Sequence, residues 1–175
     1  MATSLNGIIC LEDGSEPFLS VAGGELIADF ARKTGSLIWG RRTYEDVQRR
    51  YDGTQEMDLN QLLNGLPKVV VSSDPNFKVI EDYEVARSPQ AAIALLSAKK
   101  CKETTVVGGS KLNAAFLDAG LVNEIVVDIE PVLVGRGLPL FAPSDTIIDL
   151  ELLSIEPVNE GEVFLRYKVA NRNNE

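Results

Sequence analysis

Histidine is absent from the chain, and only two cysteines occur among its 175 residues. The lack of histidine excludes Ser/His/Asp and Cys/His nucleophile systems, rules out histidine metal sites and removes the commonest general base. Cys10 and Cys101 lie far apart without CxxC spacing, so we expect neither a disulfide framework nor a zinc site, and both are predicted to be small core residues. Any chemistry of this chain must need little acid–base help, and no metal is expected.

Long apolar runs and a positive net charge are absent as well. The chain has no stretch of about 18 apolar residues, and its first residues lack the basic-then-apolar order of a signal peptide, which predicts a cytoplasmic protein without a membrane segment. The formal net charge of −9 would repel the negatively charged phosphate backbone of a nucleic acid, so nucleic acid is disfavoured as a partner. With 45% hydrophobic residues, the chain can bury a full core, and its length favours one domain over residues 1–175.

Apolar β-branched runs alternate with amphipathic helical patterns along most of the chain. Unbroken apolar runs are typical of strands buried on both faces, as in a parallel sheet, and the alternation with helices predicts an α/β fold. The predicted strands span residues 36–40, 68–73, 104–109 and 123–135, and the predicted helices span 23–33, 42–51, 88–100 and 110–120.

The C-terminal part has a different pattern. Two apolar segments, 149–158 and 162–170, are linked by the short sequence NEG at 159–161, which predicts an antiparallel hairpin. The sheet is therefore expected to be mixed.

Three of the predicted strand ends carry residues suited to a phosphate group. The carboxyl ends of parallel strands meet at one edge of a sheet, where the following helices present unpaired amides and the positive end of their dipoles. Together the three junctions predict a dinucleotide site, and their arginines and serines favour NADPH over NADH because they suit an extra phosphate. The residues are Gly40, Arg41, Arg42 and Thr43 at the first junction, Ser72 and Ser73 at the second, and Gly108, Gly109, Ser110 and Lys111 at the third.

Each junction alone has an ordinary structural explanation. A Gly-Gly pair often makes a tight turn, Thr43 suits a helix cap with Arg41 and Arg42 on a solvated face, and serines commonly end strands. The chain also has no GxGxxG fingerprint, so an ordinary Rossmann site is not predicted. The prediction of a dinucleotide site depends on the joint occurrence of the three junctions.

The sequence resembles the dihydrofolate-reductase-like superfamily and, within it, the pyrimidine reductases of riboflavin biosynthesis. The resemblance implies a three-layer α/β fold with a mixed, mostly parallel central sheet, flanking helices and a C-terminal antiparallel hairpin. It implies that Leu112 and Ala2 join the NADPH-binding residues named above, and that the double glycine carries a cis peptide beside the pyrophosphate. The segments that carry it are MATSLNGII (1–9), GRRTYEDV (40–47), VVVSSD (69–74), VVGGSKLNAAFLDAGLVNEI (106–125) and PVLVGRGLPLF (131–141).

On the substrate side the chain departs from the family. The family usually reads SLDGKIA where this chain reads SLNGIIC, so Asn6 and Ile8 replace a charged pair. Asn6 still offers a donor and an acceptor and is one candidate catalytic residue, although Asn6-Gly7 also suits a turn. Glu16 stands near the expected substrate phosphate, which it would repel. Glu130 is a candidate for proton supply.

The remaining residues that the resemblance places near substrate are Thr3, Ser4, Arg32, Gly135 and Gly137. For Arg32, a solvated position on an acidic helix is the favoured alternative, and the two glycines also suit an ordinary loop. Met1 falls inside what is the first, central strand in the family, so that strand is expected to be short.

The implied activity is hydride transfer from NADPH to the ribose C1′ of a ribosylaminopyrimidine phosphate. Hydride transfer gains chiefly from the alignment of donor and acceptor, which suits a chain without histidine. The alternatives are a reductase of another small heterocycle or carbonyl compound, and a non-catalytic NADPH-binding protein. Members of the family often form homodimers, and a homodimer is expected here.

Overall fold

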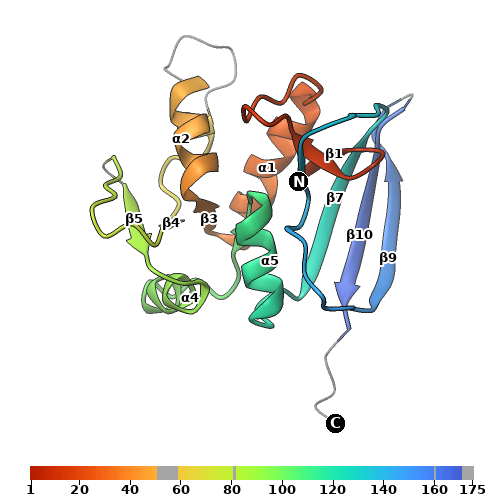
Figure 1. Ribbon diagram of the computed structural model, residues 1–175. Coiled ribbons are helices and arrows are strands. Elements are labelled where there is room, and N and C mark those ends of the chain that lie inside the picture. Colours follow the sequence, from red (N-terminus) through yellow and green to blue (C-terminus); the bar gives the residue numbers. More distant parts are fainter. Residues whose placement is uncertain (51–58, 81, 160, 171–175) are drawn as a thin grey trace.

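A computed structural model of the chain describes residues 1–50, 59–80, 82–159 and 161–170. Its helices gather around one sheet, while a second sheet forms the opposite side of the molecule (Figure 1). In the described part of the chain, none of the helices is long and apolar enough to span a membrane.

The first sheet contains four parallel strands in the order β5 (Tyr83–Ala86), β4 (Lys68–Val71), β3 (Leu37–Gly40) and β6 (Thr105–Val106). Three of them confirm the predicted strands. The fourth, β5, was missed because YEVA is short and follows a polar loop. β6 is shorter than predicted because the chain turns at Gly108 and Gly109 directly after it.

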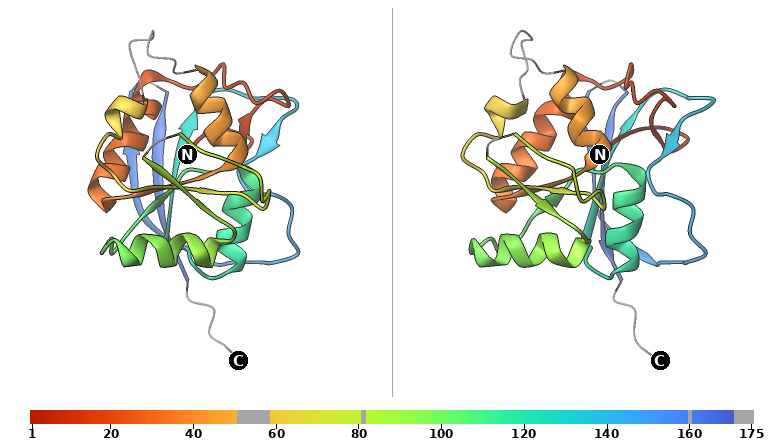
Figure 2. Two further views of the ribbon diagram at one scale, coloured as in Figure 1. Left: turned by 90° about the vertical axis from the view of Figure 1, so that its left-hand side faces the viewer. Right: turned by 60° about the vertical axis from the view of Figure 1, so that its left-hand side comes forward.

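Helices cover both faces of this sheet, which produces three layers (Figure 2). On one face, α1 (Val21–Thr34) and α2 (Arg41–Arg50) pack on Trp39 and Val70. On the other, α4 (Pro89–Ala98) and α5 (Ser110–Asp118) pack on Ile38 and Val69. Because neighbouring strand residues point to opposite faces, the continuous apolar runs of β3 and β4 supply both cores.

A short helix, α3 (Leu59–Leu62), contacts α1. The predicted helices are confirmed, except that Tyr51, at the end of the second, lies outside the described residues.

The second sheet has the strand order β1 (Ala2–Ser4), β7 (Glu124–Glu130), β10 (Val163–Val169) and β9 (Leu150–Pro157). β1 runs parallel to β7, and β9 and β10 form the predicted antiparallel hairpin, whose turn includes residue 160 outside the described part.

The expected central sheet is divided into two. β1 is only three residues long and pairs with β7 alone, and no strand pairing in the described residues joins the two four-stranded sheets. A further pair, β2 (Ile8–Cys10) and β8 (Leu138–Pro139), forms a small antiparallel sheet. Cys10 is buried and Cys101 half-buried, and neither forms a disulfide.

Candidate functional site

A cleft of about 1150 Å³ opens at the carboxyl ends of β3 and β4, where α2 and α5 begin. All three predicted phosphate-binding junctions contribute to it, so the sheet brings together residues that are up to about 70 positions apart in the chain. From the residues predicted to bind cofactor, the lining includes Ala2, Gly40, Arg41, Arg42, Thr43, Ser72, Ser73, Gly109, Ser110, Lys111 and Leu112.

The double glycine forms a tight junction between β6 and α5. The Gly108–Gly109 peptide is cis, as the resemblance implied, and Gly108 has a φ of +81°, a conformation that glycine adopts most readily. The amide of Gly40 donates a hydrogen bond of 2.6 Å to the carbonyl oxygen of Gly108. A methyl group on Gly40 would lie only 3.1 Å from that oxygen, so the end of β3 approaches the turn closely because it has no side chain there.

The start of α5 is suited to an anion. Gly109 is its N-cap and supplies no side-chain cap to the nine-residue helix. The first amides of a helix have no partner within the helix and carry the positive end of its dipole. Gly109, Ser110 and Lys111 all line the cleft, so this end of α5 can receive a phosphate group.

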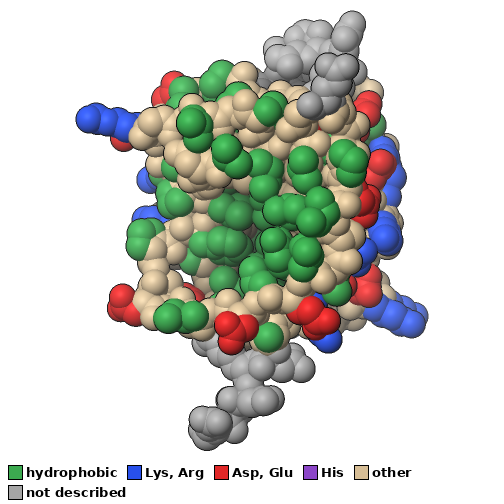
Figure 3. Space-filling view, turned by 90° about the vertical axis from the view of Figure 1, so that its right-hand side faces the viewer, with side chains coloured by type: hydrophobic (Ala, Val, Ile, Leu, Met, Phe, Trp, Pro, Cys, Tyr) green, Lys and Arg blue, Asp and Glu red, His purple; other side chains and the backbone are tan. Residues whose placement is uncertain are grey.

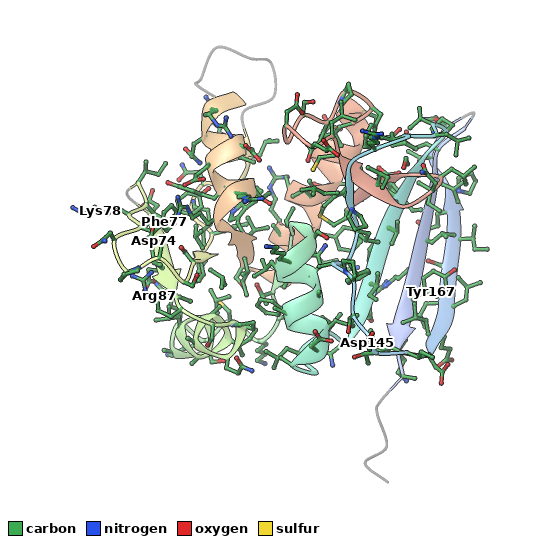
Figure 4. All side chains as sticks on the ribbon, viewed as in Figure 1. Asp74, Phe77, Lys78, Arg87, Asp145 and Tyr167 are labelled. Atoms are coloured by element: carbon green, nitrogen blue, oxygen red, sulfur yellow. The ribbon has the colours of Figure 1, made fainter. Side chains whose placement is uncertain are left out.

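Three contacts hold Arg41 in a defined orientation. Two of the partners, Asp74 and Phe77, are labelled in Figure 4. Its Nε donates to Glu45 Oε1 and its Nη1 to Asp74 Oδ2, both at 2.8 Å, and its guanidinium carbon lies 5.3 Å from the centroid of the Phe77 ring. The hydrogen bond to Glu45 is the largest cause of a raised pKa at Arg41, so the side chain stays charged. These contacts engage two of the five N–H groups of the guanidinium.

Arg87 is a cleft residue that the sequence analysis missed. Its Nη1 donates to the carbonyl oxygens of Ser72, at 3.1 Å, and Asp74, and its Nη2 to that of Pro75 at 3.2 Å. The guanidinium therefore ties the end of β5 to the loop after β4, and it lines the cleft beside Ser72. The sequence contains a pattern that could have indicated it, because Arg87 and Ser88 stand between a strand and a helix, as the residues at the Gly40 and Gly109 junctions do.

Asn6 is not among the residues that line this cleft. Its Nδ2 donates to the carbonyl oxygen of Val134 at 2.8 Å, and its Oδ1 accepts from the Val134 amide at 3.1 Å and from Ser4 Oγ at 2.9 Å. Asn6 thus joins the turn after β1 to the loop that precedes β8. Thr3 is buried and donates through Oγ1 to the carbonyl oxygen of Ile8.

Three further residues predicted to contact substrate also lie away from the cleft lining. Arg32 is exposed and donates to Asp29 Oδ1 at 3.0 Å and to the carbonyl oxygen of Leu62 at 2.9 Å. Gly135 has open space around it. Gly137 packs so closely on β2 that a methyl group there would lie 2.2 Å from the carbonyl oxygen of Cys10. Glu16, in contrast, does line the cleft.

Glu130 belongs to a buried group of carboxylates, which we call the acid trio: Asp128, Glu130 and Glu162. One oxygen from each lies within 4.8 Å of the others, a separation at which two charges repel by roughly 3.5 kcal/mol at an effective dielectric constant of about 20. Burial raises the pKa of Asp128 to about 7, and the charges of Glu162 and Glu130 add to that rise. Because the trio does not line the cleft, its position does not support the predicted role of Glu130 in proton supply.

Comparison with known proteins identifies relatives over most of the chain. The family model of the RibD C-terminal domain matches residues 1–164. Two uncharacterized proteins of Bacillus subtilis are similar: YyaP, 23% identical over 95% of this chain and 91% of its own, and YwjB, 28% identical over 81% of this chain and 79% of its own.

Solved structures show the same fold. A putative riboflavin biosynthesis protein from Shewanella sp. PV-4 superposes with a TM-score of 0.73 at 22% identity, covering 98% of this chain and 97% of its own. RibD of Acinetobacter baumannii gives a TM-score of 0.74 at 16% identity, covering 97% of this chain and 56% of its own. They confirm the predicted dihydrofolate-reductase-like α/β fold. Because the family match extends over residues 1–164 of 175, the chain belongs to the RibD C-terminal domain family.

Proposed function

We propose that this protein is an NADPH-dependent reductase. The observation that carries the proposal is the convergence of three strand ends, rich in glycine, serine and arginine, on one cleft in a member of the RibD C-terminal domain family; two of these ends, at Gly40 and Gly109, lead directly into helices. Such junctions at the carboxyl ends of parallel strands are where nucleotides bind in α/β proteins.

The residues of the cleft fit a dinucleotide with an extra phosphate. Gly40 and Gly108 lie in close contact and have no side chains, so the backbone at this junction is open to a ligand. The start of α5 suits the pyrophosphate. Arg41, Ser72, Ser73 and Arg87 supply charged and hydroxyl donors for the additional phosphate that distinguishes NADPH from NADH. When bound, NADPH supplies the hydride, and the chain binds and orients the reactants.

The proposed reaction is hydride transfer to a ribosylaminopyrimidine phosphate, or to a related compound. One solved relative, from Thermotoga maritima, has a name that includes 5-amino-6-(5-phosphoribosylamino)uracil reductase; it covers 97% of this chain and 55% of its own, with a TM-score of 0.70 at 14% identity. A substrate panel led by this class of compound, with NADPH oxidation followed at 340 nm, tests the assignment.

A different small heterocycle or carbonyl substrate is the second candidate. Three observations favour it: the Asn6 amide bonds to Val134, Arg32 lies away from the cleft, and Glu16 places a carboxylate in it. Turnover of another compound with rejection of the pyrimidine phosphate supports this candidate. NADPH binding without turnover of any compound supports a non-catalytic role.

Replacing Arg41 with alanine is expected to weaken NADPH binding by about 10- to 100-fold, because one charge-assisted contact to a phosphate is lost. NADH binding is expected to change less. The measurement is a titration of purified protein with each nucleotide, followed by nucleotide fluorescence.

Arg32→Ala is the matched control, because it removes an exposed arginine outside the cleft lining. Equal losses of NADPH affinity in both variants, or no binding to the unchanged protein, contradict the assignment of the cofactor site.

We also propose that the protein is a homodimer through the outer face of the second sheet. Hydrophobic side chains gather across the middle of this face (Figure 3), and Leu150, Leu152, Leu153 and Ile155 of β9 are exposed. Ile155 pairs with Leu165 of β10, which extends the apolar surface onto the next strand. A second copy is the expected occupant because two-fold symmetry places one apolar patch against its equal and removes both from water.

Ile155→Glu is expected to convert the dimer to a monomer, since two carboxylates would be buried in the symmetric interface. Light scattering after size-exclusion chromatography measures the mass. Ile80→Glu is the control, because Ile80 is also an exposed isoleucine but lies in the loop before β5, a strand of the first sheet. A monomeric unchanged protein contradicts the proposal.

A further inference from the structure

The acid trio lies where three elements meet. Asp128 and Glu130 are alternate residues of β7 and therefore point to the same side of the sheet. Glu162 directly precedes β10, whose Val163 pairs with Ile129, so the register places it beside Glu130. The segment before α1 reaches the same point through Ser20. The three side chains are 0%, 5% and 1% exposed, respectively.

The hydrogen bonds of the trio leave one carboxylate without a donor. Glu130 Oε1 accepts from the Ser20 amide at 3.0 Å, and Glu162 Oε1 accepts from Ser20 Oγ at 2.7 Å. Glu162 also accepts from Asn159 Nδ2. Among the described residues, both oxygens of Asp128 are buried and have no hydrogen-bond partner. Its carboxylate nevertheless points at the other two, because one of its oxygens belongs to the group that lies within 4.8 Å.

Among the described residues, no cationic side chain forms an ion pair with a member of the trio. The buried α-ammonium of Met1 lowers the pKa of Asp128, but less than burial and the two glutamates raise it. Buried carboxylates are retained in proteins when they are paired, protonated or bound to a metal. Carboxylate oxygen is a hard ligand, which suits Mg²⁺, Mn²⁺ or Ca²⁺ rather than the softer metals.

The number of carboxylates favours Ca²⁺ over Mg²⁺. Ca²⁺ takes about 6–8 oxygen ligands in a flexible geometry, whereas Mg²⁺ keeps several of its waters and is usually held by one or two carboxylates. The trio offers three carboxylate oxygens, each within 4.8 Å of the others.

We propose that Asp128, Glu130 and Glu162 bind a divalent cation, with Ca²⁺ preferred to Mg²⁺. The cation satisfies the Asp128 carboxylate and links β7, β10 and, through Ser20, the start of α1. Leu19 and Phe18, directly before Ser20, line the cleft, so the bound cation also fixes one wall of the candidate active site. The remaining coordination positions are available to water.

The test uses the full chain. The protein is first treated with a chelator, and the chelator is then removed. Calorimetric titration with CaCl₂, MgCl₂ and MnCl₂ measures binding, and thermal unfolding with and without each salt measures the linked stabilisation. We expect one Ca²⁺ per chain, a Tm that rises by about 5–10 °C at 100 times the Kd, and weaker binding of Mg²⁺.

Asp128→Asn and Glu130→Gln are both expected to remove Ca²⁺ binding and the rise in Tm. Glu156→Gln, which changes an exposed carboxylate on β9 of the same sheet, is expected to leave both unchanged. The use of two variants keeps the test decisive if one does not fold.

Several results overturn the proposal. The absence of Ca²⁺ and Mn²⁺ binding to the unchanged chain, with no response of Tm, shows instead that Asp128 and Glu162 share a proton. Retained Ca²⁺ binding in Asp128→Asn places the ion elsewhere. Mg²⁺ binding as tight as that of Ca²⁺ contradicts the preference that three carboxylate ligands predict.

Discussion

Asp128→Asn is expected to raise the free energy of unfolding of the chelator-treated protein at pH 8, by about 4 kcal/mol. The reason is the cost of a buried negative charge. Asp128 is fully buried, and the pKa of its carboxyl group is raised from 3.8 to about 7 by burial first and by the charges of Glu162 and Glu130 next. Asparagine has nearly the same shape, carries no charge and can donate to the neighbouring carboxylates.

The pH dependence follows from the direction of this shift. Below pH 3.8 the carboxyl group is protonated in both the folded and the unfolded chain and contributes nothing. Between pH 3.8 and about 7 the unfolded chain releases the proton that the folded chain keeps, so stability falls as pH rises. Above about pH 7 the loss of stability from this group is complete, and it does not change further with pH. The variant is therefore expected to lack this fall in stability.

Urea denaturation at pH 5 and pH 8, in the presence of a chelator, measures the effect. The matched control is Asp145→Asn, which removes an exposed carboxylate labelled in Figure 4. An identical pH dependence in the unchanged protein and in Asp128→Asn contradicts the assignment. With Ca²⁺ present at 100 times the Kd, the proposed cation site predicts that the unchanged protein gains about 2.7 kcal/mol and the variant gains nothing, so the difference between them narrows.

Gly137→Ala is expected to lower the free energy of unfolding by about 3 kcal/mol. A methyl group at this position would lie 2.2 Å from the carbonyl oxygen of Cys10 and 2.5 Å from Ile8 Cγ2. The first of these is a backbone atom, so the overlap can be relieved only by moving β2 away from β8. Cys10 and Leu138, paired between these strands, both line the cleft, and weaker nucleotide binding is expected to accompany the loss of stability.

Gly135→Ala is the control for this substitution. Gly135 lies in the same loop, has no heavy atom within 4 Å of the position of an added methyl group, and does not have a positive φ. Its replacement is expected to change stability by less than about 0.5 kcal/mol. The free energy of unfolding of both variants is measured without ligand, so that only the effect on packing is compared. Equal free energies of unfolding for Gly135→Ala and Gly137→Ala contradict the prediction.

The sequence by itself determined the local elements and the order of the layers. Apolar runs without alternation, as in VVV at 69–71, predict strands buried on both faces, and these strands do lie between two helical layers. The junctions at Gly40, Ser72 and Gly108 were predictable as one cleft because parallel strands direct their carboxyl ends to one edge. Periodicity and turn chemistry are properties of neighbouring residues, so a sequence contains them directly.

Only the tertiary structure decided which distant residues meet. Asn6 bonds to Val134, 128 residues away, instead of lining the cleft, because a loop passes over the turn after β1. Asp128 belongs to β7 and Glu162 directly precedes β10, and only the register of β7 with β10 brings their carboxylates together. No periodicity encodes such contacts, since they depend on how β1, β7 and β10 pair and on what covers them. The cleft at the strand ends was therefore predictable from the sequence, whereas the acid trio and the surroundings of the residues predicted to contact substrate were not.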